Sequence, residues 1–178
     1  MSDCSVLVDD NICYLKQGVD LLRRLSDEQY ATKLPDSYNS SVGGHMRHCL
    51  DHYINFLDGF ESGKVDYDAR ARDTRIEQER AFALSSMDSL SQRLMAVRTE
   101  DADKPVMVKM DCGDDTDSAT LWSASSLRRE FQFLVSHTVH HYALIGMMLK
   151  HQGIDTGKEF GIAPSTLRYM QSQSACAR

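Results

Sequence analysis

The sequence predicts an all-α fold: a four-helix bundle with a short hairpin or extended insertion between its third and fourth helices. Apolar residues recur at helical spacing in four separate stretches of about twenty residues each. The chain contains only 3 prolines and 10 glycines, which argues against a β fold with many turns. Its length of 178 residues suits one domain, so we expect a single domain over residues 1–178.

The first helix is expected over about residues 5–25, where apolar residues alternate at steps of four and three. Ser26 with Gln29 then matches a capping box, in which each side chain bonds the backbone N–H of the other residue. This motif predicts a further short helical turn. Pro35 ends the pattern, because proline cannot continue the hydrogen bonding of a helix.

The second and third helices are expected on either side of a charged segment, KVDYDARARD. The second should begin at a serine cap, Ser40 or Ser41, and end at Gly63. Another apolar stripe predicts the third helix over about residues 74–98.

The last third of the chain contains the insertion, the fourth helix and a tail. After Pro105, apolar and polar residues alternate as in a strand, and the following CGDDTDS is rich in turn-forming residues. Ser125 or Ser126 can cap the fourth helix, which should end near Gly153. The tail, about residues 154–178, is expected to pack on the bundle as a strap or to be partly disordered.

The composition excludes several classes of partner. The net charge is −6 and no long run of Lys or Arg occurs, so we expect no binding to nucleic acid or to a membrane surface. The N-terminus is acidic where a secretory signal would be basic, and no stretch reaches the roughly twenty apolar residues of a membrane-spanning helix. The five cysteines are scattered without a CxxC pair, which indicates reduced thiols. We therefore expect a cytoplasmic protein with a small-molecule substrate.

Six of the seven histidines fall in two short clusters, GGHMRHCLDHY in the second helix and SHTVHHYAL in the fourth. His137 and His141 are four residues apart, so they lie about 40° apart on a helical wheel. They share a stripe with apolar residues, so we expect both to face the core, with His140 at the rim. Two imidazoles one turn apart can bind one transition metal ion.

The first cluster can supply a third ligand for this metal. His45, His48 and His52 lie within about 60° of arc on their helix; His48 is our first choice, His52 the second, and His45 a further alternative. Three imidazole ligands leave coordination positions open for water or a thiol, which is typical of a catalytic site. The competing interpretation is that the histidines are hydrogen-bonded core residues that bind no metal.

Two acidic residues are candidates for a supporting or catalytic role. Glu130 lies two turns before His137 on the same stripe, and Asp51 lies beside the first cluster. Either could accept an imidazole N–H and so determine its tautomer, or act as a general base. Arg70 or Arg72 could pair with a substrate anion if the charged segment folds over the site, although such a segment is more often a solvated loop.

With these motifs, HMRHCLDHY and SHTVHHYALIG, the chain resembles the DinB/YfiT-like superfamily of bacterial four-helix-bundle proteins assigned as metalloenzymes. The resemblance runs from the first helix through the fourth and rests on one histidine of the second helix plus an HxxxH motif of the fourth. It implies His48, His137 and His141 as ligands of a divalent ion such as zinc or nickel, and a homodimer. Characterised relatives include S-transferases and isomerases that use low-molecular-weight thiols, and metal-dependent hydrolases.

The resemblance implies no particular substrate. Many relatives continue the second motif as HHRGQ, whereas this chain has HHYALIG, and its segments DYDARARD and GIAPSTLRYM resemble a subgroup without a settled activity. We therefore expect a metal-dependent hydrolase or thiol S-transferase. The alternative is a non-catalytic bundle protein that binds a metal or another ligand.

Overall fold

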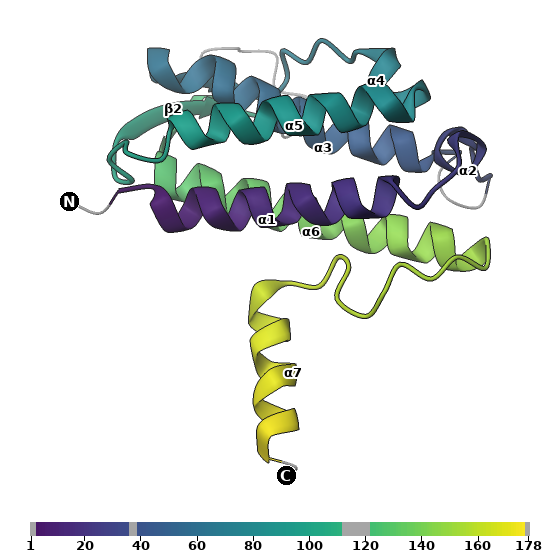
Figure 1. Cartoon of the computed structure of the whole chain (residues 1–178). Helices are drawn as coiled ribbons and strands as arrows, with labels where there is room; N and C mark the ends of the chain where they lie inside the picture. The colour runs from purple at the N-terminus through teal and green to yellow at the C-terminus, as the bar shows by residue number, and fades with distance from the viewer. Residues whose placement is uncertain (1–2, 36–38, 112–121, 177–178) are drawn as a thin grey trace.

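The computed structural model describes residues 3–35, 39–111 and 122–176, without the side chains of residues 174–176. Four long helices lie side by side (Figure 1): α1 (Ser5–Leu22), α3 (Val42–Gly59), α5 (Arg80–Ala96) and α6 (Leu127–His151). Helix α1 contacts α5 and α6, and α3 contacts the same two helices, so the four enclose one core. No helix in the described part of the chain combines the length and apolar character that crossing a membrane requires.

Serine caps begin several helices, as the sequence predicts. Ser26 and Gln29 form both hydrogen bonds of the capping box at the start of α2 (Asp27–Ala31). Ser41 and Ser126 each accept a backbone N–H in the first turn of α3 and of α6. Because these bonds join residues only three positions apart, the starts of these helices follow from local sequence.

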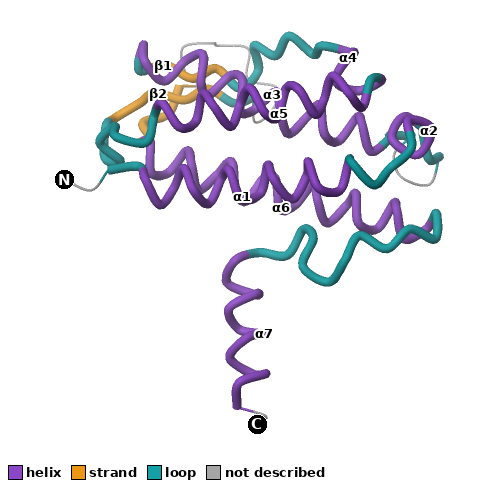
Figure 2. The backbone as a smooth tube through the Cα atoms, viewed as in Figure 1, coloured by secondary structure: helices purple, strands orange, loops and turns teal. Residues whose placement is uncertain are grey.

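A three-stranded sheet lies at one end of the long helices (Figure 2), so the expected all-α class is too narrow. Its strands, in spatial order, are β1 (Lys64–Asp66), β2 (Pro105–Lys109) and β3 (Trp122–Ser126). Strands β2 and β3 are antiparallel and form the expected hairpin, whereas β1 pairs in parallel with β2. With only three residues, β1 is too short to show strand periodicity, so the sequence pattern misses it. The predicted turn CGDDTDS lies outside the described residues.

The expected third helix is two helices, α4 (Thr74–Gln78) and α5, interrupted at Glu79. Glu79 has an extended backbone (φ −114°, ψ 96°), which breaks the helical hydrogen bonding. Ile76 and Ala83 lie on either side of the break and are both buried. Because they are about two helical turns apart in sequence, the apolar stripe continues across the break and does not reveal it.

The tail after α6 has two parts. Residues 152–163 run back along the long helices, and Phe160 stacks on Tyr142 with ring centroids 4.7 Å apart. Helix α7 (Pro164–Cys176) then points away from the four long helices, and its Tyr169 is 64% exposed. The first part of the tail therefore lies on the helices and the second part does not.

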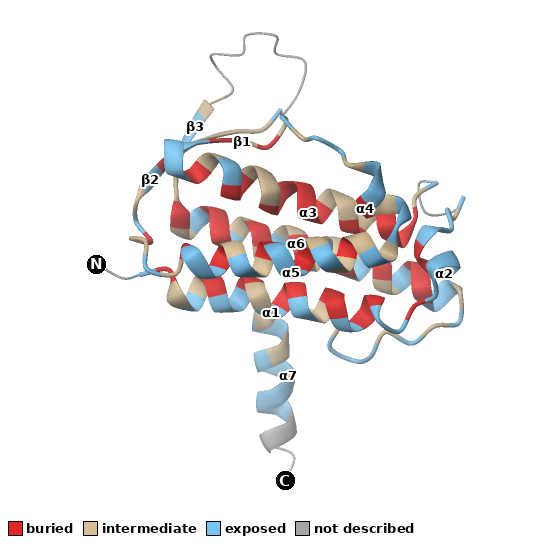
Figure 3. Cartoon of the chain, turned by 45° about the horizontal axis from the view of Figure 1, so that its top comes forward, coloured by how far each residue is buried: buried red, intermediate tan, exposed pale blue. Residues whose placement is uncertain are grey.

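Buried residues line the sides of the long helices that face one another (Figure 3), and they include a polar network next to the histidines. The Tyr53 hydroxyl donates to Oδ1 of Asn11 (2.9 Å) and accepts a hydrogen bond from the Thr138 hydroxyl (3.3 Å). Asn11 also donates to a backbone carbonyl of α6 (3.2 Å). Tyr53 follows His52 and Thr138 follows His137, so this network holds α1, α3 and α6 together beside both histidine clusters.

Candidate metal centre

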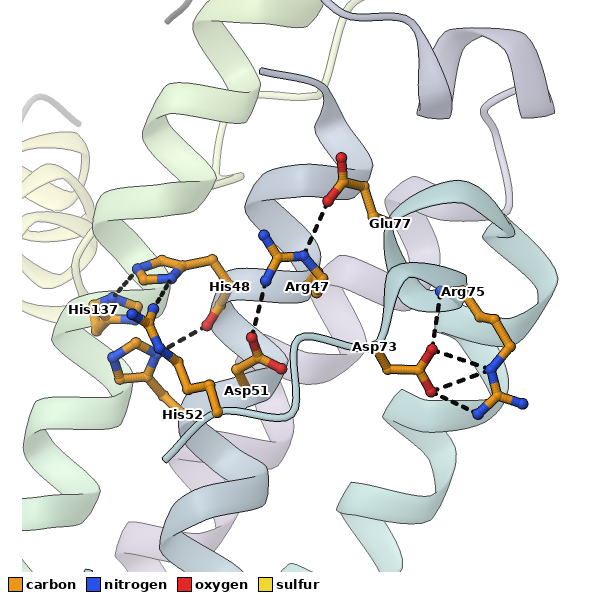
Figure 4. A network of polar contacts seen from close by, with 9 residues as sticks. Arg47, His48, Asp51, His52, Asp73, Arg75, Glu77 and His137 are labelled. Carbon is orange, nitrogen blue, oxygen red and sulfur yellow. Dashed lines mark hydrogen bonds and ion pairs between the residues drawn. The ribbon is translucent and has the colours of Figure 1, made fainter. Parts of the chain in front are cut away.

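Helices α3 and α6 bring the two histidine clusters together (Figure 4). The Nε2 atoms of His48 and His137 are 3.1 Å apart. The ring of His52 lies against that of His137, with centroids 4.0 Å apart. One nitrogen from each of these three residues lies within 4.8 Å of the others, a separation that one metal ion can bridge.

His141 and His45 extend this cluster. The ring centroid of His141 is 4.6 Å from that of His48 and 4.5 Å from that of His137. Its Nδ1, however, lies 3.0 Å from Nδ1 of His45. The structure thus brings the three predicted ligands His48, His137 and His141 together, but places His52 in the most compact group of three. Which imidazoles bind a metal stays a prediction.

Burial favours the neutral form of these imidazoles. It is the main cause that lowers the pKa of His48 to about 4, of His137 to about 2 and of His141 to about 3, and neighbouring histidines act in the same direction. Burial also lowers the pKa of His45 and of His52. A neutral imidazole keeps the lone pair that a metal requires, so the cluster suits a metal at neutral pH.

Hydrogen bonds determine which ring nitrogens carry that lone pair. Nδ1 of His52 donates to the backbone carbonyl of His48 (2.9 Å, Figure 4), so Nε2 of His52 keeps its lone pair. Nδ1 of His48 accepts a hydrogen bond from Nη1 of Arg70 (2.9 Å), because a guanidinium has only donors. The hydrogen of the neutral His48 ring is therefore on Nε2, where it points at His137.

Aromatic side chains lie against one side of the cluster. Tyr67, just after β1, stacks on His52 with ring centroids 5.5 Å apart. Phe133, one turn before His137 on α6, lies 5.6 Å from that ring and 5.2 Å from Tyr67. Tyr67 is a site residue that the sequence analysis missed. The sequence does contain a sign of its burial: Val65 and Tyr67 are hydrophobic residues two positions apart within a charged segment, and both are buried in the structure.

The two predicted carboxylates lie near the cluster but bond to other groups. Asp51 is buried and accepts a hydrogen bond from Arg47 (3.1 Å, Figure 4); burial raises its pKa, and Arg47 acts in the opposite direction. Glu130 accepts hydrogen bonds from the hydroxyls of Tyr67 (2.7 Å) and Ser125. Between residues that the structure describes, no imidazole bonds to either carboxylate. Their role as tautomer-determining acceptors or general bases stays a prediction.

These features define a class: a mostly helical protein with a candidate divalent-metal site between two long helices. Residues 18–145 match the family described as the DinB superfamily. Because this match covers more than half of the chain, the protein belongs to the DinB superfamily.

One curated protein that is similar to the chain is FK506-binding protein 5 of Rhizopus delemar. The two are 28% identical over 109 residues, which cover 61% of this chain and 28% of that protein. The chain thus spans less than a third of that relative's length. No solved structure matches the chain.

Proposed function

We propose that the protein is a metal-dependent enzyme whose histidine cluster holds one divalent transition metal ion, zinc or nickel. The observation that carries this proposal is that one ring nitrogen of each of His48, His52 and His137 lies within 4.8 Å of the others. Two imidazole nitrogens on one tetrahedral zinc ion are about 3.3 Å apart, given zinc–nitrogen bonds of about 2.0–2.1 Å. The 3.1 Å between Nε2 of His48 and Nε2 of His137 is close to this value, so the residues present fit the ion.

His48 and His137 are the two ligands of this proposal, and the third is His141 or His52. The family resemblance favours His141, whereas the compact group in the structure favours His52. His52 has the better-supported donor atom, because its Nδ1 bond to a backbone carbonyl leaves Nε2 free.

The reaction that we propose is hydrolysis of a small molecule, or transfer of a low-molecular-weight thiol to one. When bound, the metal would lower the pKa of a coordinated water or thiol and so supply the nucleophile. The chain's own residues hold the neutral imidazoles in place, and Tyr67 and Phe133 shield one side of the cluster from water. The net charge of −6 favours a small-molecule substrate over nucleic acid.

Elemental analysis of the purified chain tests this proposal. We expect one zinc or nickel ion per chain, and loss of that ion in His48→Ala and in His137→Ala. Comparison of His52→Ala with His141→Ala identifies the third ligand. The exposed His151 provides the control, since His151→Ala should keep the metal. A wild-type chain that takes up neither metal at neutral pH would contradict the proposal.

A non-catalytic metal- or ligand-binding role is the second candidate. It is favoured by the hydrogen bonds of the two nearby carboxylates. Asp51 accepts one from Arg47. Glu130 accepts one from Tyr67 and one from Ser125. A general base must reach the proton that it removes, and these carboxylates already accept other hydrogen bonds. Under this alternative, the metal-loaded protein turns over no thiol-acceptor or ester substrate, while His137→Ala lowers the melting temperature.

A further inference from the structure

Arg70 forms no ion pair with a carboxylate among the residues that the structure describes. Nearby Arg47 pairs with Asp51, and Arg75 pairs with Asp73 (Figure 4). The side chain of Arg70 instead makes one hydrogen bond within the described part of the chain, to Nδ1 of His48. Its Nε atom is buried and has no hydrogen-bond partner there. A buried donor of a cation without an acceptor is costly, so an acceptor supplied by a ligand would stabilise this side chain.

The contact between Arg70 and His48 also opposes the binding of a metal. Because Arg70 donates to Nδ1, the neutral His48 ring carries its hydrogen on Nε2, the atom that faces His137. A metal ligand needs the lone pair at that position, so the hydrogen must move to Nδ1 and Arg70 must give up its bond. A divalent ion at the cluster would in addition repel the positive charge of Arg70.

We propose that Arg70 binds an oxyanionic group of the substrate, a carboxylate or a tetrahedral oxyanion, and that this couples substrate binding to metal binding at His48. The inference rests on the proposed function, and it names the substrate class. A guanidinium presents donors in a planar fork that matches the oxygens of such groups. The oxyanion gives Arg70 a new acceptor in place of His48, and its negative charge reduces the repulsion between Arg70 and the metal.

Thermodynamic linkage gives this proposal a measurable form. If an anion on Arg70 favours the metal-binding form of His48, then the anion must raise the affinity for the metal, and the metal must raise the affinity for the anion by the same factor. Removal of the guanidinium should have two effects: tighter metal binding in the absence of an oxyanion, and loss of the response to oxyanions.

The test is a Co²⁺ titration of the chelator-treated full-length chain at neutral pH, followed by the visible absorption of the bound ion. Each titration is done in sodium chloride, which supplies no oxyanion, and, at equal ionic strength, in sodium acetate or sodium sulfate, which separate the carboxylate from the tetrahedral oxyanion. We expect Arg70→Gln to bind Co²⁺ more tightly than wild type in chloride, by a factor on the order of 10. Acetate or sulfate should raise the affinity of wild type and leave that of Arg70→Gln unchanged.

Two further variants make the result specific to Arg70. Arg72→Gln removes an exposed charge from the same segment and should behave as wild type. Arg70→Lys keeps the positive charge but loses the planar array of donors. It should therefore keep the lower affinity for Co²⁺ in chloride and lose most of the response to acetate and sulfate.

The outcomes separate this inference from the proposed function. If wild type binds Co²⁺, and Arg70→Gln shows the same affinity and the same anion response, only the role of Arg70 is overturned. If Arg72→Gln reproduces the effect of Arg70→Gln, the change in affinity comes from loss of positive charge in the segment and not from Arg70 itself, and the inference also fails. If no variant and no wild-type sample binds Co²⁺, both the proposed function and the inference fail.

Discussion

At the scale of single residues, the cluster is a group of imidazoles held neutral by burial and by one another. His48 contacts the rings of His52, His137 and His141, so protonation of one ring would place a charge against its neighbours. The same crowding suits a shared metal, because one ring nitrogen of each of His48, His52 and His137 lies within 4.8 Å of the others.

This arrangement predicts that the metal-free protein is destabilised by acid. The pKa of His48 falls from 6.5 to about 4 in the folded state, and that of His137 falls to about 2, so the unfolded chain binds protons at a higher pH than the folded chain does. The unfolding free energy should therefore fall progressively as the pH drops from about 6.5 to about 4.

Urea denaturation of the chelator-treated protein over this pH range measures the effect. His137→Asn should show a shallower dependence on pH, because one of the shifted groups is removed. His151→Asn, at an exposed position, should follow wild type. A wild-type stability that does not change between about pH 6.5 and pH 4 would show that the buried histidines do not resist protonation.

At the scale of helices, close approach between elements depends on particular glycines. Gly43 lies in the first turn of α3, and a Cβ atom there would come within 2.0 Å of the Glu77 carbonyl oxygen at α4. Gly146 lies within α6, and the atoms nearest to its would-be Cβ are 3.8 Å or more away. The same substitution should thus have opposite effects at these two positions.

We predict that Gly43→Ala lowers the unfolding free energy by about 1–3 kcal/mol, because backbone atoms of α4 would have to move. Gly146→Ala should raise it by about 0.5–1 kcal/mol, since alanine restricts the unfolded chain and favours the helix. Urea denaturation of both variants measures the difference. An equal effect of the two substitutions would contradict the packing of α3 against α4.

The elements themselves follow from the sequence to different degrees. The four long helices were predicted because each has an apolar stripe, to which α3 and α6 add a serine cap. The interruption at Glu79 was missed because Ile76 and Ala83 keep the stripe continuous. Strand β1 was missed because three residues carry no periodicity and its pairing with β2 is long-range.

At the scale of the whole molecule, the tail is attached through its first part. Phe160 stacks on Tyr142 against the long helices, whereas Tyr169 on α7 is 64% exposed.

We predict that Phe160→Ala lowers the free energy of unfolding by about 1–3 kcal/mol, because the contact with Tyr142 is lost. Tyr169→Ala, a matched aromatic truncation, should change stability by less than about 0.5 kcal/mol. Thermal unfolding by calorimetry gives both values, and a larger cost for Tyr169→Ala would show that α7 packs on the chain.

Two features of the site could be predicted from local sequence: two long helices carry histidines four residues apart on apolar faces, and serine caps begin these helices. These features depend on contacts within a few residues, which the helical period makes visible. Only the packing of the fold shows that His52 lies against His137, that His141 faces His45, and that Arg70 contacts His48. These contacts depend on the rotation and offset of α3 against α6 and on the path of the chain after β1. Residues far apart in the chain set both, so no local pattern records them.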